Sequence, residues 1–353
     1  MAETTGGILL CAALSGLLLC SCGAGNSYAD REMITAMEIQ AQEEGYCVTA
    51  EYMTQSSSEE PPERKTVSGE GATYMEAVYH MGRISGISPY LDSCRTVVLR
   101  GEMSPETLLS LLEQLDSDPG VRPGTLLCRA EEGGGVFERE DTSVCVGEEL
   151  EKKLSAGELS ELTLKQAITA VKTQGLDRLV PVISKDGTEI TGYQTLSGNA
   201  AWEADIAALL PFAQKDAVRS LQYEGKNHSI HIDDTHMMIR GGYQDEKACF
   251  QLTIRLNGRL SERDGEIAGE TAELQHMLAE AAEREYCAVL EEIVKKGETD
   301  LFGFGRILAL SQPRCWEKVR EDWSSEIKNM ECKITVEAIL RDAEGKGSFG
   351  QHY

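Results

Sequence analysis

Two cysteines near the N-terminus stand in a pattern that could carry a lipid, Leu19-Cys20-Ser21-Cys22. Bacterial lipoprotein signals end in a small residue before the modified cysteine, with leucine or a similar residue three positions upstream of it. Ser21 precedes Cys22 and Leu19 occupies the upstream position, whereas Cys20 directly follows the large Leu19. We therefore expect cleavage before Cys22 and attachment of acyl chains such as palmitate there. An ordinary cleaved signal with incidental cysteines, or a buried core helix, is the alternative.

The largely apolar run before these cysteines has the length of a signal-peptide core. It covers twelve residues, 8–19, whereas a helix that spans a bilayer needs about 20. The segment before it contains Glu3 and no basic residue, although a positive charge is usual there. Residues 1–21 are therefore predicted to be a cleaved signal peptide.

The charge of the chain restricts its partners. The 59 acidic and 34 basic residues give a formal net charge of −25. Nucleic-acid backbones and anionic lipids both attract clustered lysine and arginine. We therefore expect no nucleic-acid partner, and a membrane attachment that depends on the lipid at Cys22.

Three histidines, His228, His231 and His236, with Asp233 and Asp234 between them, form the most metal-like cluster. The stretch is predicted to be extended, so alternate side chains point to opposite faces. His231 and Asp233 would share one face, and the other two histidines would lie on the opposite face. Because no helical zinc-binding spacing is present, a solvated strand edge is the favoured interpretation, and no metal or other cofactor is expected.

Catalytic motifs are also lacking. Residues 303–308, GFGRIL, have two glycines of a nucleotide-binding fingerprint but lack the third, and a helix is predicted before them where that motif needs a strand. No nucleophile elbow or phosphate-binding loop occurs. We therefore expect a protein that is not an enzyme.

The most distinctive segment covers residues 300–323. Phe302 and Phe304 flank Gly303, and a helix opened by Pro313 would place Trp316 and Trp323 on one face. This spacing favours packing against a sheet over a partner-binding surface. We expect all four aromatic side chains to be largely buried, and Gly303 or Gly305 to adopt a backbone conformation that a side chain would hinder.

The elements that position these residues are read from periodicity and capping signals. A strand is expected over 47–53, an exposed loop over 55–65, and helices that begin near Thr73 and Ser104. The middle of the chain is predicted to hold a helix over 164–171, a hairpin from 179 to 196 and a helix over 200–210. An alternating strand over 249–258, a long helix over 267–296 with Ala281 on its apolar stripe and Gly297 as its stop, and a strand over 332–340 complete the third part.

This mixture predicts an α+β fold of three domains without a doubly wound sheet. The first domain would cover residues 22–150, a small middle domain 151–215, and the C-terminal domain 216–346, with a tail over 347–353. The eight cysteines downstream of Cys22 are scattered without paired spacing, so neither a zinc site nor a disulfide scaffold is indicated.

The distinctive segment resembles the C-terminal signature of the Ger(x)C family, the lipoprotein C subunits of bacterial spore germinant receptors. The ordered matches are Asp300, Phe302, Gly303, Phe304, Gly305, Trp316 and Trp323. Residues 73–86, 192–202 and 258–262 also resemble segments of that family.

The resemblance implies a non-catalytic subunit, anchored through lipid at Cys22 to the extracytoplasmic face of the spore inner membrane. It also implies two integral membrane partners, the A and B receptor subunits, with which the chain would trigger germination. A lipoprotein that binds a small solute, or a lipid-anchored hydrolase, is the alternative from another class.

Overall fold

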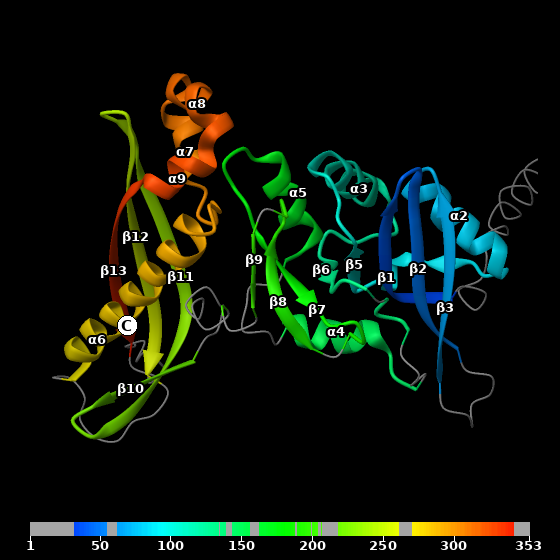
Figure 1. The fold of residues 1–353 in the computed structure, drawn as a ribbon. Helices are drawn as coiled ribbons and strands as arrows, with labels where there is room; N and C mark the ends of the chain where they lie inside the picture. The colour runs from blue at the N-terminus through cyan, green and yellow to red at the C-terminus, as the bar shows by residue number, and fades with distance from the viewer. Residues whose placement is uncertain are drawn as a thin grey trace, which may run out of the picture.

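The computed structural model places two β-sheets side by side, each covered by helices (Figure 1). It describes residues 32–54, 62–133, 135–138, 143–155, 162–187, 189–198, 200–203, 206, 218–260 and 270–341. The fold is of the mixed α/β kind that the sequence predicts. Cys22 and the expected signal peptide lie outside these ranges. None of the helices in the described ranges is both long and apolar enough to cross a bilayer.

Within the described ranges the first sheet has nine strands. Their order is β3-β2-β1-β5-β6-β7-β8-β9, and β4 pairs with β1 outside this path. The central pairs β1–β5, β5–β6 and β6–β7 are parallel, and the outer pairs are antiparallel. The strands are β1 (Glu32–Gln42), β2 (Gly45–Thr54), β3 (Glu63–Gly71), β4 (Pro89–Tyr90), β5 (Thr96–Arg100), β6 (Leu126–Ala130), β7 (Leu179–Ile183), β8 (Ile190–Thr195) and β9 (Ala201–Glu203).

Helices cover both faces of this sheet. On one face α2 (Tyr74–Ser85), α3 (Pro105–Ser117) and α5 (Leu164–Lys172) share one apolar core. On the other face α4 (Val146–Ser155) packs in a second core. The predicted caps are confirmed, because Thr73 and Ser104 accept backbone N–H bonds from Glu76 and Thr107.

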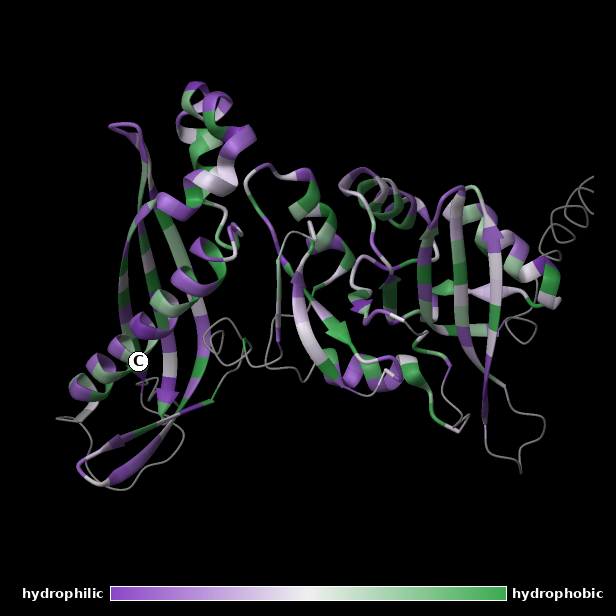
Figure 2. Ribbon diagram, viewed as in Figure 1, coloured by the Kyte–Doolittle hydropathy of each residue, from purple (hydrophilic) through white to green (hydrophobic). Residues whose placement is uncertain are grey.

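The part of the second sheet that the structure describes has four strands in chain order, β10 (Val218–Tyr223), β11 (Lys226–Gln244), β12 (Lys247–Leu260) and β13 (Glu331–Arg341). The alternation predicted for β12 is confirmed, since Phe250, Leu252, Ile254 and Leu256 are buried, and Figure 2 shows the resulting bands of colour. The elements on its apolar face are α6 (Glu270–Val289), a π-helix (Leu290–Lys295), α7 (Phe304–Ser311), α8 (Pro313–Val319), a 3₁₀ helix (Arg320–Asp322) and α9 (Trp323–Asn329).

Several local predictions were wrong. The helix expected over 200–210 begins instead as strand β9, because residues 201–203 pair with β8. The loop expected over 55–65 ends earlier, since β3 starts at Glu63 and pairs with β2. On the long helix the buried small residue is Ala282 and not Ala281. The helix expected to carry both tryptophans is broken by the 3₁₀ helix, so Trp316 lies on α8 and Trp323 begins α9.

The domain boundaries stay a prediction. Strand pairing shows, however, that the boundary proposed at residue 150 does not separate two sheets. Strands β6 and β7 pair across the boundary proposed at residue 150, through Arg129↔Val182 and Ala130↔Ile183. The first and middle parts of the chain therefore contribute to one sheet.

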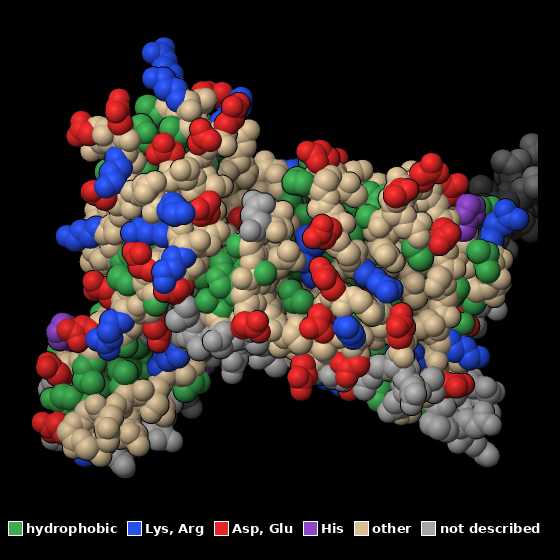
Figure 3. All heavy atoms as spheres, viewed as in Figure 1, with side chains coloured by type: hydrophobic (Ala, Val, Ile, Leu, Met, Phe, Trp, Pro, Cys, Tyr) green, Lys and Arg blue, Asp and Glu red, His purple; other side chains and the backbone are tan. Residues whose placement is uncertain are grey.

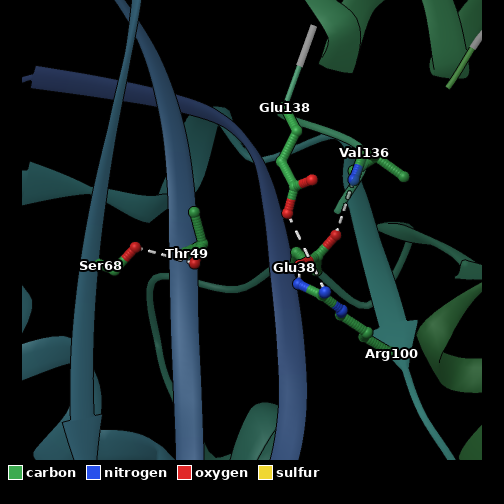
Figure 4. Close-up of polar contacts among 6 residues, drawn as sticks. All are labelled: Glu38, Thr49, Ser68, Arg100, Val136 and Glu138. Atoms are coloured by element: carbon green, nitrogen blue, oxygen red, sulfur yellow. Dashed lines mark hydrogen bonds and ion pairs between the residues drawn. The ribbon is translucent and has the colours of Figure 1, made fainter. Parts of the chain in front are cut away.

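A buried carboxylate ties the centre of that sheet to a loop. Glu38 on β1 accepts a hydrogen bond of 2.9 Å from the Val136 amide and pairs with Arg100 at 3.1 Å (Figure 4). A second carboxylate, Glu138, lies 3.9 Å from the same guanidinium. These contacts satisfy a charge that would be costly to bury alone.

Candidate functional site at the junction of the two sheets

The segment from Asp300 to Trp323 lies where the middle part of the chain meets the second sheet. At its start, the buried carboxylate of Asp300 accepts four hydrogen bonds. Three come from the backbone amides of Gly303, Phe304 and Gly305, at 2.7, 2.9 and 2.7 Å. The fourth comes from the Trp323 indole N–H at 3.0 Å. One side chain thus satisfies the free amides at the start of α7 and fixes α9 against it.

The environment of this carboxylate sets two effects against each other. Burial raises the pKa of Asp300 to about 6, and the hydrogen bonds from Gly305, Phe304, Trp323 and Gly303 oppose that rise. Desolvation favours the neutral form, whereas the N–H donors favour the anion. The group therefore titrates in the mildly acidic range.

This titration makes stability depend on pH. The folded chain binds the Asp300 proton more tightly than the unfolded chain does. The contribution of Asp300 to the free energy of unfolding is therefore greatest below pH about 3.8 and is lost as pH rises through about 6. The free energy of unfolding of the parent, minus that of Asp300→Asn, should fall by roughly 3 kcal/mol over this interval. Urea unfolding of both chains at several pH values measures the difference. A difference that grows toward pH 7 would mean that the hydrogen bonds dominate and the pKa is lowered.

Glycines bring two backbones into contact at the junction. A Cβ atom at Gly175 would lie 2.5 Å from the Cα atom of Gly305, closer than side chains allow. The Arg306 amide donates to the Gly175 carbonyl at 3.3 Å, and the Asp177 amide donates to the Asp300 carbonyl at 2.9 Å. Backbone hydrogen bonds therefore join the loop after α5 to the start of α7.

Two tryptophans complete this contact. The Trp316 indole donates to the Gln174 side-chain oxygen at 2.8 Å, and its ring meets Trp323 edge-on with centroids 5.3 Å apart. A Cβ atom at Gly305 would lie 2.9 Å from each of the two indoles. The predicted backbone conformation is confirmed at Gly303, whose φ of 80° is left-handed. At Gly305 a side chain is excluded by the neighbouring rings and not by the backbone conformation.

An apolar layer extends the junction. Leu179 and Tyr193 from the first sheet, and Ile206 from beyond its last strand, pack in one cluster with Val289 and Ile293 from the end of the long helix. Trp202 and Phe302 are partly buried against it. Phe302 is therefore half-buried, unlike Phe304, Trp316 and Trp323, which are buried as predicted.

The long helix ends at Lys295 with Lys296 as its C-cap, so Gly297 directly follows it as predicted. The left-handed residue after the long helix is Glu298, with φ of 51°. At Gly297 a Cβ atom would meet the ring of Trp202 at 2.3 Å. Gly297 therefore has a further role beside its place at the helix end, because the indole from β9 lies against it and leaves no room for a side chain.

The partners supplied by the middle of the chain, Gln174, Gly175 and Trp202, escaped prediction. Each lies roughly 100 or more residues from what it contacts, and none belongs to a periodic pattern. A glycine in a polar loop carries no signal that distinguishes a close backbone contact from an ordinary turn.

The histidine cluster lies on β11, away from the junction. His231 contacts Asp233 at 3.1 Å and His236 contacts Asp234 at 2.6 Å, while His228 is buried. Within the described ranges no three His, Cys, Asp or Glu residues are grouped so as to hold a metal ion. These contacts are ordinary pairs along one strand.

Two thiols in the cores of the first sheet are held in unreactive surroundings. Burial raises the pKa of the Cys94 thiol to about 12, and raises that of Cys128 as well, so both stay protonated near neutral pH. A hollow of about 890 Å³ lies beside β8 and β9, with Glu131 and Lys185 on its wall. Its aromatic residues, Tyr193 and Trp202, already serve the apolar junction. The contacts of the junction can hold the two sheets in a fixed relation.

Two family models together match residues 26–344. The model described as spore germination protein N-terminal domain matches residues 26–185, and the model described as spore germination B3/GerAC like, C-terminal matches residues 175–344. Both matches include Gly175 and Asp177. The crystal structure of the GerBC protein has a similar fold, with a TM-score of 0.52 and 14% sequence identity over 86% of this chain and 96% of that chain. No curated protein sequence matches the chain.

Proposed function

Because the chain belongs to the Ger(x)C family of germinant-receptor C subunits, we propose that it is the lipid-anchored C subunit of a spore nutrient-germinant receptor. It acts without catalysis, together with integral membrane A and B subunits, to trigger germination. The observation that carries this proposal is the match of both family models over 26–344. Among the signature residues, Trp316 bonds to Gln174 and Gly305 meets Gly175 across the junction, while Asp300 holds Trp323 beside them.

The proposed anchor is a lipid on Cys22, at the extracytoplasmic face of the spore inner membrane. Ser21 and Leu19 supply the cleavage chemistry. A single acyl chain gives only marginal attachment, so the several chains of a mature bacterial lipoprotein, or the partner subunits, add to it. The net charge of −25 gives no electrostatic attraction to anionic lipid.

Removal of the anchor tests the proposal. We expect Cys22→Ala to leave a folded chain that no longer stays on the spore membrane, and receptor assembly to weaken. Tethering raises the concentration of a subunit near its partners to roughly millimolar, and that gain would be lost. Membrane fractionation, mass spectrometry of the mature N-terminus and nutrient germination in a strain with this receptor alone measure the three effects.

The matched control is Cys20→Ala, which removes the neighbouring thiol and should change none of these readouts. Normal nutrient germination after deletion of the gene in that strain would refute the proposed function and favour the solute-binding alternative. A mature N-terminus that starts elsewhere, or lacks acyl chains, would refute the anchor alone.

A further inference from the structure

Strand β11 has an edge that pairs with no other strand in the part of the chain that the structure describes. Residues 226–231 pair with β10, whereas those after a β-bulge that follows Ile232 pair with β12 alone. At the far end, the Tyr243 amide donates to the side-chain oxygen of Gln312 at 3.0 Å. Between these limits one side of residues 235–241 is left unpaired, and we call this stretch the open edge.

The turn between β11 and β12 fixes which backbone groups point out of the open edge. Asp245 and Glu246 form a two-residue loop and have positive φ values of 47 and 61°, as in a type I′ hairpin. The residues that flank such a loop bond to each other, and the bonded pairs then alternate along the two strands. The even-numbered residues of this part of β11 therefore bond to β12. The outward N–H and C=O groups belong to Thr235, Met237, Ile239 and Gly241.

Side chains along the open edge are exposed on both faces of the sheet. Met237 lies on the face that carries the helices, because its partner on β12 is the buried Ile254, yet it is 53% exposed. Met238, on the opposite face, is 52% exposed. Figure 3 shows hydrophobic side chains between the places that β11 and β9 occupy in Figure 1. Methionine side chains suit a surface that adapts to an apolar partner.

Arg240 adds a charge preference to the open edge. It is exposed on the same face as Met238 and forms no ion pair within the described ranges. By contrast, Arg255 on the neighbouring strand pairs with Glu337 at 3.0 Å. A strand added along β11 would place one side chain directly opposite Arg240, and an acidic side chain there would be favourable.

An extended segment of a partner protein suits the open edge, whereas a second copy of the chain does not. A row of outward backbone groups is satisfied by another extended backbone. In an antiparallel pair of two copies centred on residues 235–241, the turn at Asp245 of one copy would fall beside His231 of the other. Val218 already pairs with His231 at that place. A single segment that ends at β10 meets no such obstacle.

We propose that the open edge of β11 binds one extended segment of an integral membrane partner subunit, which adds a strand to the second sheet. The segment matches residues 235–241, a length of about 24 Å. Its alternate side chains are apolar where they lie beside Met237 and Ile239, and it carries an acidic side chain opposite Arg240. This inference rests on the proposed function, because the receptor assembly supplies the partner.

Hydrogen exchange measured amide by amide tests the added strand. The lipidated full chain is compared alone and after co-purification with its A and B subunits. The amides of His236, Met238 and Arg240 are internal controls, since they bond to β12 in both states. In the assembled receptor we expect exchange to slow by about tenfold or more at the four outward amides, which are those of Thr235, Met237, Ile239 and Gly241.

A pair of proline variants tests the same contact independently. Met237→Pro removes one outward N–H and keeps the bonds to β12. The matched control is Ser220→Pro on the edge strand β10. Tyr223 and Lys226 flank the turn of that hairpin, so by the same alternation the Ser220 amide also points out of the sheet. We expect Met237→Pro to reduce co-purification with the A and B subunits by about tenfold, and Ser220→Pro to leave it unchanged.

Urea unfolding of the two variants checks that both are folded, and the exchange of the parent chain decides the matter if either is not. Unchanged exchange at the outward amides in an assembled receptor, or equal co-purification of two folded proline variants, would overturn the added strand and leave the proposed function standing. Slow exchange of the same amides in the chain alone would overturn it in favour of self-association. A parent chain that does not co-purify with the A and B subunits would overturn the added strand and the proposed function together.

Discussion

The alanine variant of Asp300 is expected to unfold at a much lower urea concentration than the parent chain. Its carboxylate is the acceptor for three backbone amides and the Trp323 indole, all within a buried site. A buried donor left without a partner costs about 1–3 kcal/mol. Four such donors should lower the free energy of unfolding by roughly 4 kcal/mol or more, a loss typical of a broken buried network.

Urea unfolding followed by tryptophan fluorescence measures this loss, because Trp316 and Trp323 both lie in the affected site. The matched control is Asp322→Ala, which removes an exposed aspartate one residue before Trp323 and should change stability by about 0.5 kcal/mol or less. Equal unfolding midpoints for Asp300→Ala and the control would show that the carboxylate does not hold the segment together.

Gly175→Ala should open the junction while each sheet keeps its own core. The new methyl group would lie 2.5 Å from the Cα atom of Gly305 and 2.6 Å from its carbonyl carbon. Neither backbone can move aside without losing the Arg306 amide bond to the Gly175 carbonyl. Overpacking costs about 1–3 kcal/mol, and alanine at a φ of +67° adds of order 1 kcal/mol or more.

Gly86→Ala separates these two causes. Gly86 has a nearly equal φ of +70°, and its Cβ position has nothing within 4 Å, so only the backbone term remains. We expect Gly175→Ala to speed hydrogen exchange of the Asp177 amide, which bonds across the junction, and Gly86→Ala to leave it unchanged. Similar exchange in both variants would mean that the close contact is not needed.

Local patterns account for what the sequence predicted well. The alternation along β12 places one buried face on a regular strand, the capping residues Thr73 and Ser104 begin two helices, and both are observed. The spacing of Trp316 and Trp323 suggested a shared helical face, and the rings do meet, but from two helices separated by a 3₁₀ helix. The periodicity therefore predicted the contact between the two rings but not the 3₁₀ helix that separates α8 from α9.

Strand β1 shows where such patterns fail. It is central to the first sheet, yet its interior includes the buried Glu38 and the half-buried Thr35. A carboxylate in a strand pattern predicts an exposed position. The burial of Glu38 becomes understandable only when its distant partners, Arg100 and the Val136 amide, are known. The junction was not predicted for the same reason, because the close contact at Gly175 depends on residues far along the chain.

The sheet shared by the first and middle parts has a consequence for the order of folding. Strand β6 ends at Ala130, and its neighbour β7 begins at Leu179, so that side of β6 lacks its partner until some fifty further residues have been made. Pairing over such sequence separations is slow, and an unpaired strand edge invites association with other chains. The chain is therefore most prone to association after β6 has been made and before β7 is available to pair with it. Any contact that covers the free edge of β6 during this interval should raise the yield of folded protein.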